Sequence, residues 1–77
     1  MQGVTRQIDI TSDLCPMTYV RTRLALDKMA TGETLLVVLK GQEPLANVPR
    51  TATEQGHQVL EVTTDEAGIS RLLIRRG

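Results

Sequence analysis

The side chain best suited to covalent chemistry in this chain is Cys15, the only cysteine. It lies between a predicted strand and a predicted helix, at or next to the helix cap. Free backbone N–H groups and the positive end of the helix dipole favour a thiolate there, and such positions lower a cysteine pKa from about 8.5 to roughly 3.5–7.5. Asp13 would oppose this effect if its carboxylate faced the sulfur. Two roles stay open from the residues alone: a reactive thiolate, or a small buried apolar side chain.

The other polar side chains do not suggest a second reactive site. His57 is the only histidine and follows a predicted helix end, where we expect a structural role. One cysteine and one histidine cannot supply the spaced ligands of a zinc or iron–sulfur site. Because phosphate-loop, nucleophile-elbow and paired-carboxylate motifs are also missing, we expect no metal and no cofactor. Arg71, Arg75 and Arg76 are expected to form a solvated basic cluster.

Alternation and helical spacing predict the elements that must position Cys15. Pro16 suits the first position of a helix, since its missing N–H would be unpaired there, and this helix is predicted to end near Ala30. Pro49 would clash with a preceding helical turn, so an opening turn is expected at 44–47 and the second helix proper from about Val48. The predicted strands are residues 7–11, 33–40, 58–64 and 69–75, and the predicted helices are 16–30 and about 48–55.

The resulting order, βαβαββ, predicts the architecture. Two right-handed βαβ crossovers would make parallel strand pairs and place both helices on one face of the sheet. The closing hairpin would add an antiparallel strand. We therefore expect an α+β two-layer sandwich with a mixed four-stranded sheet, and residues 1–77 are expected to be a single domain.

The first predicted helix carries two apolar stripes. The longer stripe is expected to face the sheet, and its residues are Tyr19, Thr22, Ala25, Leu26 and Met29. The shorter stripe is Met17, Val20 and Leu24, beside Arg21. We hypothesise that part of it is exposed and docks a partner. The competing expectation is that it is buried against the second helix.

The composition excludes several classes of function. Nine Lys and Arg balance nine Asp and Glu, and the only aromatic residue is Tyr19, so neither a basic surface nor a stacking platform for nucleic acid is expected. The longest apolar run, residues 35–39, is far too short to span a membrane. With no apolar leader and one cysteine, a cytoplasmic location is expected.

Several short motifs, in this order, resemble the TusA/SirA-like sulfur-carrier family. They are Cys15-Pro16 at a strand–helix junction, Gly32-Glu33 opening an apolar strand, a proline-containing second helix, Gly56-His57 and a C-terminal hairpin. The resemblance covers about residues 7–76. It implies a βαβαββ sandwich, similar in fold to the C-terminal domain of translation initiation factor three. It also implies that Cys15 accepts sulfur as a persulfide, with Pro16 as the proline of its Cys-Pro pair.

The chain departs from the family pattern of Cys-Pro-x-Pro, because Met17 and Thr18 follow Pro16. The change restores a backbone N–H in the first helical turn and adds a hydroxyl. That hydroxyl could bond an anionic sulfur on Cys15, or it could satisfy the helix's own turn. We expect Pro16, Met17 and Thr18 to support the site from the helix N-terminus, and we identify the chain as a divergent branch.

The resemblance implies a sulfurtransferase-type carrier that relays sulfur between partner proteins. The donor would be a cysteine desulfurase or a rhodanese-like protein, and the acceptor a downstream protein; donor, acceptor, pathway and the choice of sulfur or selenium stay open. One alternative is a non-catalytic regulatory or interaction module on the same fold. An RNA-binding module is a weaker alternative, given the zero net charge. A ubiquitin-like carrier is rejected, because the chain ends in a single Gly77 and begins with a βα pattern.

Overall fold

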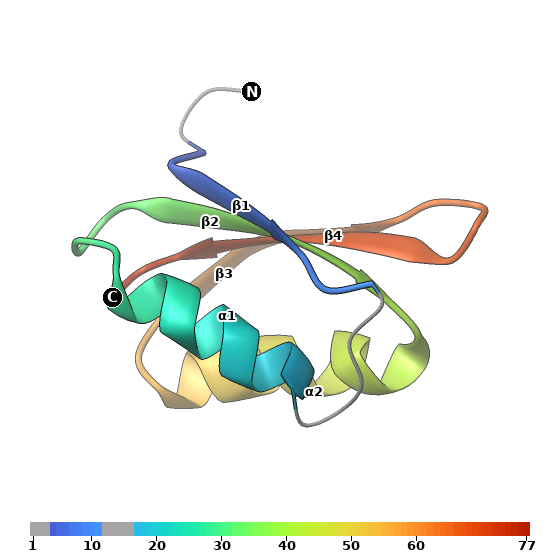
Figure 1. The fold of residues 1–77 in the computed structure, drawn as a ribbon, viewed down its shortest axis with the longest axis horizontal. Helices are drawn as coiled ribbons and strands as arrows, with labels where there is room; N and C mark the ends of the chain where they lie inside the picture. The colour runs from blue at the N-terminus through green and yellow to red at the C-terminus, as the bar shows by residue number, and fades with distance from the viewer. Residues whose placement is uncertain (1–3, 12–16) are drawn as a thin grey trace.

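The computed structural model describes residues 4–11 and 17–77, which form one sheet with two helices packed on the same face (Figure 1). In chain order the elements are β1 (Arg6–Asp9), α1 (Met17–Asp27), β2 (Thr34–Lys40), α2 (Gln42–Glu54), β3 (Gln58–Thr64) and β4 (Ile69–Arg75). The predicted βαβαββ order and the α+β two-layer sandwich are confirmed.

The four strands lie in the order β1–β2–β4–β3. β1 pairs with β2 in parallel, and β4 is antiparallel to both β2 and β3. The prediction of a second parallel pair is wrong, because β4 lies between β2 and β3. The burial of the two strands gives the physical reason. β4 contains the fully buried Leu72 and Ile74, whereas every residue of β3 except the half-buried Val59 is exposed, so the more apolar strand takes the interior place.

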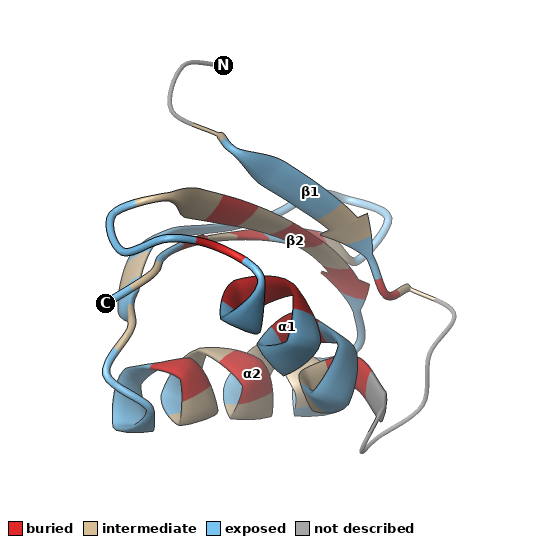
Figure 2. Cartoon of the chain, turned by 60° about the vertical axis from the view of Figure 1, so that its left-hand side comes forward, coloured by how far each residue is buried: buried red, intermediate tan, exposed pale blue. Residues whose placement is uncertain are grey.

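One apolar core fills the space between the sheet and the helices (Figure 2). Buried and half-buried side chains alternate along β2, which is the pattern of a strand that is covered on one face. Its fully buried residues are Leu35, Val37 and Leu39. The longer stripe of α1 faces this core, as predicted. Its buried members are Thr22, Ala25, Leu26 and Met29, and Tyr19 is half-buried.

The second helix begins earlier than predicted. α2 is continuous from Gln42 to Glu54 and has Pro49 inside it, so the separate opening turn at 44–47 is wrong. A proline in a helix interior costs about 3 kcal/mol, chiefly through one lost hydrogen bond and its clash with the preceding turn. Val48 and Ala52, on either side of Pro49 along the chain, are both fully buried. Their burial against the sheet fixes the helical path through the proline, which local propensity alone would interrupt.

The boundaries of the first two elements also differ from the predicted ones. β1 ends at Asp9 instead of residue 11, although the Ile10 N–H still donates to Val38 O (2.8 Å). α1 ends at Asp27 instead of Ala30. There the N–H groups of Lys28 and Met29 donate to the carbonyls three residues earlier (3.2 and 3.0 Å), so the last turn is tighter than an α-helix.

Candidate functional site

The region of interest is the connection from β1 to α1, where the sequence places Cys15. Cys15 and Pro16 lie outside the described residues, so the predictions made for them stay predictions. Met17 is the first residue of α1, and its side chain is not described. The described residues on both sides define how the chain enters and leaves this connection.

On the strand side, Asp9 and Thr11 end β1 with a local turn. The Asp9 carboxylate accepts hydrogen bonds from the Thr11 backbone N–H (2.9 Å) and the Thr11 hydroxyl (2.7 Å). The hydroxyl bond is the main reason that the pKa of Asp9 lies below its ordinary value. This arrangement is an Asx turn, which competes with continued strand pairing. An Asp-x-Thr pattern at a strand end is a signal for it that the sequence interpretation overlooked.

On the helix side, Thr18 and Thr22 hold the start of α1 against the core. Thr18 is buried and Thr22 is fully buried, and the Thr22 hydroxyl donates to Thr18 O (2.8 Å). Thr18 therefore belongs to the core-facing side of the helix. This placement gives the threonine a packing role, and the proposed bond from its hydroxyl to a sulfur anion stays a prediction.

The far end of α1 is bonded by an arginine for which no local sequence pattern predicts such a role. Arg76 donates from Nε to Leu26 O (2.8 Å), across fifty positions of sequence, and so satisfies a carbonyl near the helix C-terminus. Arg71 and Arg75 are exposed as predicted, but the prediction that Arg76 is solvated with them is wrong. The arginine is half-buried because it completes the last turn of α1.

His57 lies in the short connection between α2 and β3, at the end of the molecule where α2 ends (Figure 1). Its Nδ1 accepts a hydrogen bond from the Gly77 N–H (3.1 Å). Burial lowers the pKa of His57, and the Arg76 charge lowers it further. The charge of Asp27, the last residue of α1, also acts on His57, so the histidine lies near the C-terminal end of this helix, whereas the Cys15 segment precedes its N-terminal end.

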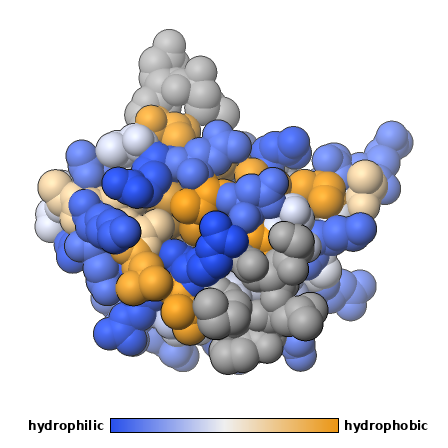
Figure 3. Space-filling view, in the orientation of Figure 1, coloured by the Kyte–Doolittle hydropathy of each residue, from blue (hydrophilic) through white to orange (hydrophobic). Residues whose placement is uncertain are grey.

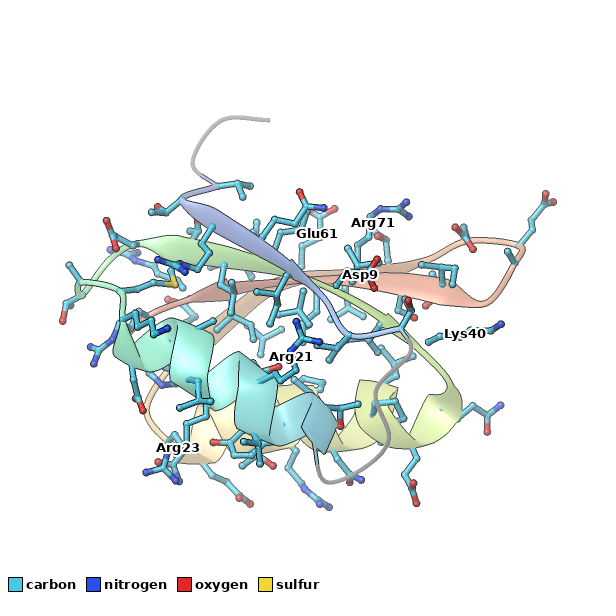
Figure 4. All side chains as sticks on the ribbon, in the orientation of Figure 1. Asp9, Arg21, Arg23, Lys40, Glu61 and Arg71 are labelled. Carbon is cyan, nitrogen blue, oxygen red and sulfur yellow. The ribbon has the colours of Figure 1, made fainter. Side chains whose placement is uncertain are left out.

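The shorter stripe of α1 is exposed where it is described. Val20 is 38% exposed and Leu24 is 54% exposed, so the competing expectation of burial against α2 is wrong for both residues. Arg21, also exposed, projects from α1 towards β1 (Figure 4), and its charge helps to lower the pKa of Asp9. The structure thus brings Val20, Arg21 and Leu24 together on one helix surface that begins directly after the Cys15 segment.

Within residues 4–11 and 17–77, no three His, Cys, Asp or Glu side chains come together in a way that could hold a metal ion. Among the same residues, no helix is long and apolar enough to cross a membrane.

The comparisons with known proteins agree with one another on the family. A family model described as sulfurtransferase TusA matches residues 6–76. A candidate sulfur carrier protein of Archaeoglobus fulgidus is 38% identical over 55 residues, which are 71% of this chain and 62% of that protein, less than two thirds of its length. A candidate sulfur carrier protein of Thermotoga maritima is 36% identical over 67 residues, covering 87% of this chain and 82% of the relative.

A third relative and a solved structure extend the comparison. The candidate sulfur carrier protein of Methanocaldococcus jannaschii is 31% identical over 71 residues, covering 92% of this chain and 93% of that one. The crystal structure of a SirA-like protein from Desulfitobacterium hafniense superposes with a TM-score of 0.83 at 23% identity, covering 94% of this chain and 97% of the other. At that identity the superposition establishes the fold.

Proposed function

Because the chain belongs to the TusA sulfurtransferase family, we propose that it is a sulfur carrier that holds sulfur as a persulfide on Cys15 and passes it to an acceptor protein. The observation that carries this proposal is the family match across residues 6–76, which includes the chain's single thiol. The names of the relatives support a sulfur-carrier role in general. The persulfide on Cys15, and the relay between two proteins, are our proposal.

The chemistry requires one nucleophilic sulfur and no resident cofactor. The Cys15 thiolate would attack the outer sulfur of a persulfide on the donor. A new S–S bond forms to Cys15, the S–S bond within the donor breaks, and the donor leaves as a thiolate. The transferred sulfur keeps its oxidation level, so the step needs no external oxidant or reductant. Delivery to an acceptor repeats the exchange, with Cys15 now as the leaving thiolate.

The position of Cys15 in the sequence favours this reactivity. It precedes the first described residue of α1, Met17, by two positions. The first N–H groups of a helix have no partners within the helix and stabilise a nearby anion, which includes thiolate and persulfide sulfur. In addition, α1 is packed into the core near its start, where Thr18 and Thr22 are buried, and Arg76 bonds Leu26 O near its end.

Intact mass spectrometry tests the proposal. The protein is incubated with a cysteine desulfurase and cysteine, or with inorganic polysulfide as a small donor. Wild type should gain the mass of sulfur and lose it again on reduction. Cys15→Ser should gain nothing and should keep the wild-type circular dichroism spectrum, because serine is also a good helix cap.

The pH dependence of alkylation adds a second readout. The Cys15 thiol should react with a pKa below the free-cysteine value of about 8.5. A pKa at or above that value, with no sulfur gained from any donor, would give Cys15 a structural role and leave the chain as an interaction module.

A further inference from the structure

The outer surface of α1 combines apolar side chains with a basic border. Val20 and Leu24 are one helical turn apart and form a strip, while the buried residues Thr18, Thr22 and Ala25 lie on the opposite side of the same helix. The strip therefore does not contribute to the core of the described chain. The space-filling view shows apolar surface set among hydrophilic surface on the side of the molecule that carries α1 (Figure 3).

Basic side chains border this strip on both sides. Arg21 and Lys28 are three and four residues from Leu24, and Arg23 is three residues from Val20, which are the spacings of helix neighbours. The one acidic residue on α1 is Asp27, whose Oδ2 lies 4.0 Å from Arg23 Nε with both side chains about 60% exposed. An ion pair this open to water is weak and leaves most of the charge available to a partner. Asp9 also lies close enough to Arg21 for that charge to lower the pKa of Asp9. Among the described residues around the strip, the three basic groups still outnumber the two acidic ones, Asp9 and Asp27.

The other exposed apolar pair of the described residues lacks these features. Leu60 and Val62 lie on the edge strand β3 and are 43% and 45% exposed. The only charged residue in that strand is Glu61, and a register shift between Val59 and Glu61 interrupts the strand edge. An irregular edge of this kind disfavours pairing with another strand. β3 therefore supplies a control surface of matched exposure and different charge.

We propose that Val20 and Leu24, with Arg21, Arg23 and Lys28, form the docking surface for the protein that donates sulfur. This inference rests on the proposed function. The matching surface on the donor has an apolar centre bordered by Asp and Glu side chains. Charge complementarity of this kind speeds association and fixes orientation, while the apolar centre supplies most of the affinity.

Chain length makes the surface compatible with transfer to Cys15. Cys15 lies two positions before Met17, the first residue of α1, so the Cα atoms of these two residues lie at most about 7 Å apart. Val20 and Leu24 follow at about 4.5 and 10 Å along the helix axis. An interface of ordinary size buries about 800 Å² on each partner, which corresponds to a patch about 30 Å across. A patch of this size centred on the strip is therefore wide enough to reach a residue two positions before the helix start.

The test measures how fast Cys15 gains sulfur from a cysteine desulfurase supplied with cysteine, by mass spectrometry over time. Leu24→Asp should lower the second-order rate at least about tenfold, because it places an acid in the apolar centre opposite an acidic border. Arg23→Glu should lower the rate at low salt, with the difference from wild type shrinking as salt is added. Leu60→Asp is the matched control and should stay within about twofold of wild type.

Inorganic polysulfide separates docking from sulfur chemistry. It needs no docking surface, so it should load wild type and all three variants at the same rate. If Leu24→Asp takes sulfur from the desulfurase as fast as wild type does, the docking surface is refuted. If polysulfide loads the wild type and the desulfurase does not, the docking surface is also refuted while the carrier function stands. If neither source loads Cys15, both proposals fall.

Discussion

Leu24 and Leu26 lie two residues apart on α1, yet they are 54% and 1% exposed, so truncating each to alanine should have very different effects. Leu26→Ala removes apolar atoms from the core and leaves a cavity, which costs about 2–5 kcal/mol of unfolding free energy. Leu24→Ala removes the same atoms from the surface and should change that free energy by less than about 0.5 kcal/mol. Both substitutions change helix propensity equally, so the difference between them reports burial.

The size of the chain makes this contrast easy to measure. At 0.05–0.15 kcal/mol per residue, a domain of this length has a total stability of about 4–12 kcal/mol. Small domains lose about 1 kcal/mol or slightly more per molar urea, so Leu26→Ala should lower the urea midpoint by at least about 2 M. Circular dichroism during a urea titration gives both midpoints. Equal losses in the two variants, or a larger loss in Leu24→Ala, would mean that α1 is rotated on the sheet and that the proposed docking surface does not exist.

Three further outcomes are expected from the fold. Pro49→Ala should stabilise the protein by about 1–2 kcal/mol in a urea titration, because it restores an N–H donor for Leu45 O within α2. The gain is smaller than the full cost of an interior proline because the alanine chain also has more conformational freedom when unfolded. Unchanged or lower stability would contradict this prediction. Burial lowers the pKa of His57 below 6.5, so as the pH falls the unfolded chain binds a proton at His57 before the folded chain does. The wild-type protein should therefore lose stability as the pH falls through 6.5, and His57→Gln should not show this loss. Thermal unfolding at about pH 7 and pH 5 compares the two, and an identical pH dependence would refute the assignment. Gly68→Ala, at φ +84° in the β3–β4 turn, should cost about 1 kcal/mol in a thermal melt, and no loss would show that the turn relaxes.

The sequence predicted the fold well wherever burial follows a simple period. Leu72 and Ile74 alternate with Arg71, Leu73 and Arg75 in the last strand, and this pattern predicted its buried face. The spacing of Ala25, Leu26 and Met29 identified the buried side of α1. These patterns arise directly from the geometry of a strand and a helix, so no tertiary information is needed.

The errors occurred where distant parts of the chain decide the outcome. Pro49 reads locally as a helix breaker, and only the packing of Val48 and Ala52 on the sheet overrides it. Likewise, nothing near Arg76 indicates that it caps a carbonyl fifty residues earlier. The insertion of β4 between two earlier strands depends on which strand buries more apolar surface, a comparison that no local window contains.

The candidate site was likewise predicted only in part. The exposed strip was predicted as one of two alternatives, because helical spacing places Val20 and Leu24 on a common surface. To decide that Val20 and Leu24 are exposed and not buried against α2, one must know where α2 packs, and the sequence does not supply that position. The place of Cys15 between a strand and a helix comes from the sequence, and its reactivity stays a prediction.

The interior position of β4 has a consequence for how the protein is made. During synthesis β1 and β2 can pair early, but β3 gains its only sheet neighbour when residues 69–75 leave the ribosome. A nascent chain that stops before Ile69 lacks the strand that joins the two halves of the sheet, so we expect it to remain unfolded. Pairings between distant segments also form slowly. The thiol therefore stays on an unfolded chain until residues 69–75 have been made, and the ability to carry sulfur should arrive in a single step at that point.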